Sequence, residues 1–197
     1  MKKILDDYKV KKREILSKLK EFESNKDYFY EMCFCILTPQ SSAKTAWSLV
    51  QRLKKLNFKD NNINPRDHIK EIRFYKNKSK YLLELKKNYS FILKSIKQKP
   101  YPKELREFLV KNVKGYGYKE ASHFLRNTGY KDVAILDRHI LKNLNKYKVI
   151  KEIPTSLTPK KYCEIEDKFL NFSKKINIPM DHLDLLFWSQ ETGEIFK

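Results

Sequence analysis

The sequence predicts an all-α protein, and three observations lead to this fold class. Apolar residues recur three and four positions apart along most of the chain, which is the spacing of one helix face. The period-two alternation that is typical of strands is scarce, and so is valine. Only four glycines occur in 197 residues. The pattern indicates about ten helices, with no internal repeat and no low-complexity tail.

In the first half of the chain, the expected helices follow from their apolar faces and their end residues. Ser41 or Ser42 can cap one helix, and Asn64-Pro65 provides the N-cap and first position of a short helix ending near Ile72. Residues 28–37 are almost entirely apolar, so we expect them to form a buried central helix. The other faces are Ile15, Leu19 and Phe22; Ala46, Trp47, Val50 and Leu53; and Tyr81, Leu82, Leu85, Tyr89, Ile92, Leu93 and Ile96.

In the second half, prolines and one glycine mark the expected helix ends. The segment 100–102, Pro-Tyr-Pro, separates two helices, and Gly129 closes the helix that runs from Glu120 to Thr128. Pro179 opens a last helix that continues through Trp188. The expected apolar faces are Leu105, Phe108, Leu109 and Val113; Ile140, Leu141, Leu144 and Tyr147; and Tyr162, Ile165, Phe169, Phe172 and Ile176.

Length and composition allow one compact unit, or two closely fused lobes, with a substantial core. The chain is 41% apolar and 13% aromatic, which excludes a disordered polycation. No apolar run approaches the roughly 18 residues needed to cross a bilayer. The first seven residues lack the apolar centre of a secretion signal, and three cysteines are too few for a disulfide framework. We therefore expect a cytoplasmic protein.

The charge of the chain favours a polyanionic partner. Lys and Arg number 43 against 24 Asp and Glu, which gives a net charge of +19. Nucleic acid is the first candidate and an anionic membrane surface the second. No basic helix keeps a strong apolar face unused by the core, which argues against the membrane. A lysine-rich surface with no specific partner is the alternative.

A glycine hairpin between two amphipathic helices is the first feature that indicates a particular function. Residues 113–119 read V-K-G-Y-G-Y-K and lie in a candidate helix–hairpin–helix at about 103–128. Gly115 and Gly117 can adopt positive φ and leave their amides open toward a phosphate, beside a helix N-terminus. Lys114 adds a cation there. An ordinary tight turn explains the same residues equally well.

Lys119 and Asp137, which follow the glycine hairpin in the sequence, are candidates for catalysis. Lys119 falls in the first turn of the second helix, where the helix dipole disfavours a cation and makes a neutral, nucleophilic amine easier to reach. Asp137 follows the apolar run 133–136 and is placed to begin the next helix. Capping that helix is the alternative role of Asp137.

These segments resemble the helix–hairpin–helix DNA glycosylase superfamily. The similarity is carried by residues 113–119 and by 135–140, which read I-L-D-R-H-I. It implies that Lys119 forms a Schiff base with the sugar and that Asp137 is essential. Residues 37–40, L-T-P-Q, are also similar, which implies that Gln40 fills the gap left by a flipped base.

Within that superfamily, the chain is most similar to the type-2 8-oxoguanine DNA glycosylase/AP lyases. Residues 117–127, 137–141 and 180–197 carry this similarity. Relatives of the endonuclease III type hold an iron–sulfur cluster with four clustered cysteines near the C-terminus. Here Cys163 alone lies in that region, so we expect no cluster, no metal and no cofactor.

The resemblance implies a bifunctional repair enzyme whose partner is double-stranded DNA containing oxidised guanine. Such an enzyme excises 8-oxoguanine through a lysine Schiff base and then cleaves the abasic strand by β-elimination. It also implies two lobes, one of about 31–118 and one of 1–30 plus 119–197, in a single unit that works as a monomer. Alternatives are a related glycosylase for another oxidised base, and a non-catalytic DNA-binding module.

Base recognition is assigned to four candidates. Trp188 offers an aromatic face for stacking on oxidised guanine, and Asp184 or the terminal carboxylate offers an acceptor for its N–H donors. The family resemblance implies that the terminal lysine, Lys197, takes part in recognition. Tyr75, or Phe74 beside it, is the candidate for a second stacking face. A core position for Trp188 and a frayed chain end are the structural alternatives.

Overall fold

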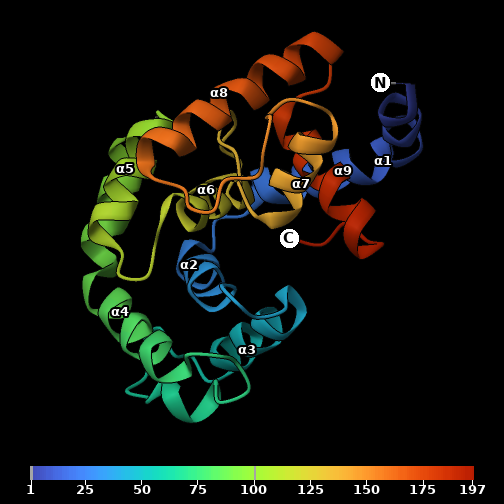
Figure 1. The fold of residues 1–197 in the computed structure, drawn as a ribbon. Coiled ribbons are helices and arrows are strands. Elements are labelled where there is room, and N and C mark those ends of the chain that lie inside the picture. The colour runs from blue at the N-terminus through green and yellow to red at the C-terminus, as the bar shows by residue number, and fades with distance from the viewer. Residues whose placement is uncertain (1, 100) are drawn as a thin grey trace. The chain divides into compact units, whose positions relative to one another are not determined.

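The computed structural model describes residues 2–99 and 101–197, and the described residues contain helices and no strand (Figure 1). This confirms the all-α prediction. None of the described helices is long and apolar enough to cross a lipid bilayer. The elements are α1 (Lys2–Ser24), α2 (Tyr28–Leu37), α3 (Ala43–Lys55), the 3-10 helix η1 (Pro65–His68), α4 (Tyr75–Gln98), α5 (Pro102–Asn112), α6 (Tyr118–Asn127), α7 (Arg138–Lys146), α8 (Pro159–Ile176) and α9 (Met180–Thr192).

The described residues group into two compact units. One consists of residues 2–25 and 125–197, and the other of residues 26–99 and 101–124. The lobes expected from the sequence change at 30/31 and 118/119, whereas the units change at 25/26 and 124/125. The correspondence between lobes and units stays a prediction.

In the unit of residues 26–124, α2 is the centre. Nine of its ten residues are buried, as the almost entirely apolar segment predicted, and it packs against α3 and α4. Phe34 is fully buried, and its ring lies 5.7 Å from Trp47 and 5.4 Å from His123, edge-to-face in both pairs. His123 therefore contributes to the packing around α2.

In the other unit, α9 packs against α1, α7 and α8. A row of stacked rings joins α8, α9 and the end of α7, with centroids 6.1 Å apart for Phe169 and Phe187 and 5.6 Å apart for Phe187 and Tyr147. Tyr8 of α1 hydrogen-bonds His182 of α9 through its hydroxyl at 2.7 Å. The last helix is thus fixed on several sides, which positions the side chains that it carries.

Helix ends largely follow their expected signals, with two differences. Ser42 is the N-cap of α3 and accepts a hydrogen bond from Thr45 N, and Asn64 caps η1 in the same way. The short helix expected up to Ile72 is only the 3-10 turn η1, and the last helix continues four residues past Trp188. Pro100, expected to help separate two helices, lies outside the described residues.

Replacing Phe34 by alanine should strongly destabilise the unit around α2. Its ring is fully buried, and deleting such a ring costs about 3–5 kcal/mol because a cavity remains. Phe91→Ala is the matched control, because that ring is 57% exposed on α4 and its loss should cost under about 1 kcal/mol. Urea unfolding measures both, and equal losses would contradict the central place of Phe34.

Candidate functional site

The glycine hairpin joins α5 to α6, and Gly115 is sterically required in it. Gly115 has φ +87°, a conformation that side chains rarely adopt. A Cβ atom at this position would lie 2.6 Å from Cδ2 of Tyr81 on α4. The close approach of Tyr81 and the positive φ therefore both demand glycine. Gly117, by contrast, has no positive φ, so only the first glycine shows the expected conformation.

The Gly117 amide is bound by a side chain of the helix that follows. Gly117 N donates to Glu120 Oε2 at 3.0 Å, which is the arrangement of a carboxylate that caps a helix N-terminus. The other oxygen of the same carboxylate, Oε1, lies 3.1 Å from Lys119 Nζ. One carboxylate therefore contacts both the hairpin backbone and the candidate nucleophile.

Tyrosines anchor the hairpin on the surrounding helices. The buried Tyr116 donates from its hydroxyl to Met32 O of α2 at 3.3 Å, and burial raises the pKa of this phenol well above its usual value. The Tyr118 hydroxyl donates to the Glu107 carboxylate at 2.6 Å, and the Arg106 guanidinium lies 5.0 Å from the Tyr118 ring. The hairpin thus has a fixed position on α2 and α5.

Lys119 and Asp137 both lie where the sequence analysis expected them. Lys119 is the second residue of α6, and its side chain is 30% exposed. Asp137 is the N-cap of α7, with Oδ1 accepting from His139 N and Ile140 N, each at 2.8 Å. Asp137 therefore does cap α7, which is the alternative role that the sequence left open. It uses one carboxylate oxygen, and across residues 2–99 and 101–197 no hydrogen bond to Oδ2 is formed. Lys119 and Asp137 belong to different units.

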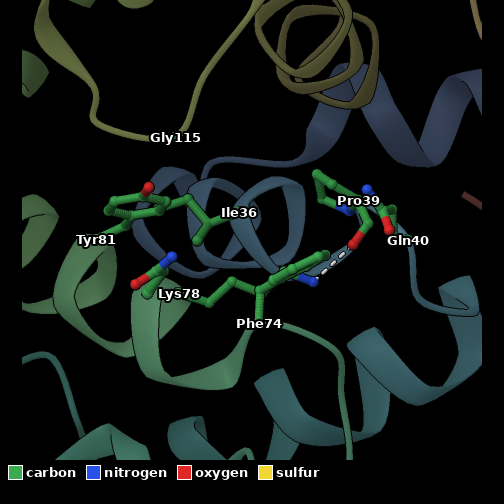
Figure 2. Close-up of a pocket in the computed structure, with 8 residues that line it drawn as sticks. Ile36, Pro39, Gln40, Phe74, Lys78, Tyr81 and Gly115 are labelled. Atoms are coloured by element: carbon green, nitrogen blue, oxygen red, sulfur yellow. Dashed lines mark hydrogen bonds between the residues drawn. The ribbon is translucent and has the colours of Figure 1, made fainter.

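Gln40 lies on a short loop after α2 and is exposed, with φ +55°. It lines a pocket together with Pro39, Phe74, Lys78 and Gly115, and with Ile36, Asn77 and Tyr81 (Figure 2). Phe74 is 53% exposed, precedes α4 and also has a left-handed backbone. The loop that carries Gln40 and the hairpin that carries Gly115 thus contribute to one pocket.

The four candidates for base recognition lie in different surroundings. Trp188 on α9 and Lys197 are half-buried, and Tyr75, the first residue of α4, is half-buried in the other unit. Asp184 is buried, with Oδ2 3.1 Å from Nη1 of the equally buried Arg126. The structure therefore gives Asp184 a partner within the protein, and its role in base recognition stays a prediction.

Burial governs the chemistry of Asp184. It raises the pKa of the carboxyl to about 7, and the nearby Asp137 and Asp181 act in the same direction. The Arg126 guanidinium opposes them. Arg126 also covers the Phe22 ring of α1 at 4.9 Å, so the pair joins α1, the end of α6 and α9.

Sequence reasoning missed the side chains that hold these candidates in place. Lys78 is 4% exposed and Glu120 bridges Gly117 and Lys119. A signal for Lys78 was present, because it falls four residues before Leu82 on the apolar face of α4. For Glu120 the signal was its place three residues after Gly117.

Comparisons with known proteins show which family the chain belongs to. Residues 10–178 match the family model described as 8-oxoguanine DNA glycosylase. An 8-oxoguanine DNA glycosylase/AP lyase of Fusobacterium nucleatum is 47% identical, covering 96% of this chain and 94% of that protein. The Methanocaldococcus jannaschii protein of the same name is 40% identical, over 89% and 85%.

A solved structure matches along the whole length. It is the Methanocaldococcus jannaschii 8-oxoguanine glycosylase/lyase in complex with a 15mer DNA containing 8-oxoguanine. The TM-score is 0.90 at 35% identity, and each chain is covered completely. This chain belongs to the 8-oxoguanine DNA glycosylase family. The hairpin, Lys119 and Asp137 lie within the residues that match the family model, whereas Asp184, Trp188 and Lys197 follow it and are covered by the structural match.

Replacing Gly115 by alanine should distort the hairpin of this 8-oxoguanine glycosylase family member. Gly193→Ala is the matched control, because Gly193 has φ +84° and nothing within 4 Å of an added Cβ. The control should cost about 1 kcal/mol of unfolding free energy for its backbone alone. Gly115→Ala should cost about 1–3 kcal/mol more, from overlap with Tyr81. Equal losses in urea unfolding would show that Tyr81 moves aside freely.

The stability of the protein should respond to the titration of Asp184. Between pH 4 and 7 the unfolded chain loses the Asp184 proton, whose usual pKa is 3.8, while the folded state keeps it up to a pKa of about 7. The folded state binds more protons in this window, so its contribution to the unfolding free energy falls as pH rises. The difference between wild type and Asp184→Asn, measured by urea unfolding, should therefore fall from pH 4 to 7. A constant difference would mean that Arg126 keeps the carboxylate ionised throughout.

Proposed function

We propose that this protein is a bifunctional repair enzyme that excises 8-oxoguanine from double-stranded DNA and then cleaves the abasic strand. The observation that carries the proposal is Lys119, a partly exposed amine in the first turn after the glycine hairpin. A monofunctional glycosylase could use an aspartate and water, so a lysine here favours lyase chemistry. The names and the DNA complex of the relatives support the same substrate.

The reaction begins when the neutral Lys119 amine attacks C1′ of the flipped nucleotide. The bond from C1′ to the base breaks, and the base leaves with the electron pair and takes up a proton. The amine then loses one proton, the C1′–O4′ bond of the sugar ring breaks and O4′ takes up a proton, which leaves a protonated imine between Nζ and C1′. The protonated imine acidifies the C2′ proton, and its removal expels the 3′ phosphate by β-elimination.

Asp137 stabilises the positive charge that develops on the sugar and can accept the proton of the lysine. Its Oδ1 is fixed by two backbone amides, so the carboxylate keeps one orientation on the N-terminus of α7. Oδ2 makes neither of these bonds and is the oxygen that we assign to catalysis. This arrangement supports a role in catalysis beside the capping of α7.

DNA is held by the hairpin and by the positive charge of the surface. Lys114 and Gly115 are exposed at the hairpin tip, and Gly117 lies at the start of α6, which suits contacts to the phosphates beside the lesion. The exposed Gln40 enters the duplex and fills the space of the flipped base.

The flipped base is recognised by Trp188, Lys197, Asp184 and Tyr75, with Trp188 and Tyr75 as stacking faces. Support is strongest for the half-buried Trp188 and Lys197, which keep accessible surface. The buried pair with Arg126 favours an indirect part for Asp184, through the position of α9. The expectation of a monomer that works in the cytoplasm stays a prediction.

Replacing Lys119 by glutamine should abolish the covalent intermediate. Borohydride reduces the imine to a stable adduct, so wild type with a duplex carrying 8-oxoguanine opposite cytosine should give a shifted band on a denaturing gel. Lys119→Gln keeps the size of the side chain without the nucleophile and should give none. Lys131→Gln is the control, because this lysine is 65% exposed and pairs with Glu23.

The pattern of adducts separates the candidate functions. Adducts with both wild type and Lys119→Gln would mean that another amine reacts. Adducts of wild type only with oxidised pyrimidines would indicate a related glycosylase for another base. No adduct with any damaged base or abasic site would leave a DNA-binding module without catalysis.

A further inference from the structure

Lys78, the fourth residue of α4, is a buried lysine with an unusual set of partners. Its side chain is 4% exposed. Nζ donates to Leu37 O at 2.7 Å and to Ser41 Oγ at 3.1 Å. It also donates to Pro39 O at 2.7 Å, the bond drawn in Figure 2. An ammonium group has three N–H donors, so each has an acceptor here. All three acceptors belong to one short segment of chain.

That segment is the one that presents Gln40. The acceptors on residues 37, 39 and 41 alternate along the chain and lie on both sides of Gln40, whose own side chain is exposed. Gln40 also has φ +55°, which is uncommon for a residue other than glycine. A conformation of this kind persists only where the surrounding structure holds it.

We propose that Lys78 is a positioning residue that holds residues 37–41 in the conformation from which Gln40 enters the DNA. The inference rests on the proposed function, in which Gln40 fills the space of the flipped base. Lys78 itself is buried, so it acts on DNA through the loop.

Capping of the α2 C-terminus by Lys78 does not account for all three of its hydrogen bonds. A cation beside a helix C-terminus satisfies free carbonyls, and the bond to Leu37 O does this for α2. Pro39 O and Ser41 Oγ lie beyond the helix, on the loop. Two of the three bonds therefore fix the loop that carries Gln40.

The surroundings of Lys78 disfavour its positive charge. Burial and the nearby positive charge of Lys119 lower the pKa of the Lys78 amine to about 8. A neutral amine has only two N–H donors and could not satisfy all three acceptors in this way. Arginine keeps a charge and several donors at this position, whereas methionine keeps the apolar stem and loses every donor.

The test is a double-mutant cycle between Lys78→Met and Gln40→Ala. Single-turnover excision of 8-oxoguanine is measured for wild type, both single variants and the double variant. Each single variant should be slower by about tenfold, and the double variant should be no slower than the single ones, because both changes remove the same function. Lys80→Met is the matched control, since this lysine is exposed on the same helix, and its effect should multiply with that of Gln40→Ala.

Two further variants keep the test decisive if Lys78→Met folds poorly. Ser41→Ala removes one of the three acceptors and leaves the lysine in place, so it should give a smaller loss that is also non-additive with Gln40→Ala. Lys78→Arg should recover much of the rate. Trapping on a preformed abasic site, where no base has to be extruded, should be changed less than excision in every variant.

Separate results would overturn the positioning role and the proposed function. Wild-type rates for Lys78→Met, losses that multiply with Gln40→Ala, or equal losses on intact and abasic DNA would overturn the role of Lys78. Absence of a wild-type adduct would overturn the proposed function. Fluorescence of 2-aminopurine beside the lesion reports base displacement without catalysis, so it tests Lys78 even in that case. An unchanged signal in Lys78→Met, where Gln40→Ala lowers it, would overturn the positioning role.

Discussion

The burial of α2 is the constraint on which the unit of residues 26–124 depends. A helix that is apolar on all sides must be enclosed, and α3 and α4 pack against it. The hairpin is tied to the same helix, because Tyr116 hydrogen-bonds Met32 O. The loop of Gln40 is tied to its end, because Lys78 binds Leu37 O. One buried helix is therefore the common reference for two segments proposed to contact DNA.

Patterns that act over a few residues were predicted well from the sequence. The apolar period gave the helices, and short-range caps such as Ser42 and Asp137 gave several of their ends. These features depend on neighbours within one or two helical turns, so the local sequence is enough to predict them. The placement of Lys119 in the first turn of α6 follows from the same local logic. The family resemblance, drawn from the hairpin and from residues 135–140, is confirmed by the comparisons.

Side chains whose partners are distant in the sequence could not be predicted in this way. Lys78 and its acceptors are about forty residues apart, and Asp184 meets Arg126 only when α6 and α9 are folded. In a chain with 43 basic residues, one buried lysine cannot be told from its many solvated neighbours by type alone. The predicted end of the short helix after Asn64 was wrong for a related reason. Local caps mark where a helix begins, whereas tertiary contacts decide how far it continues.

The Glu120 carboxylate connects the hairpin backbone with the side chain of Lys119. It occupies the Gly117 amide with one oxygen and contacts the Lys119 ammonium with the other. An anion that binds the same amide must compete with this carboxylate, which is also the partner of Lys119. Any anion at the Gly117 amide therefore acts on the same acidic side chain that contacts the amine, because the carboxylate and a phosphate cannot both occupy one backbone donor.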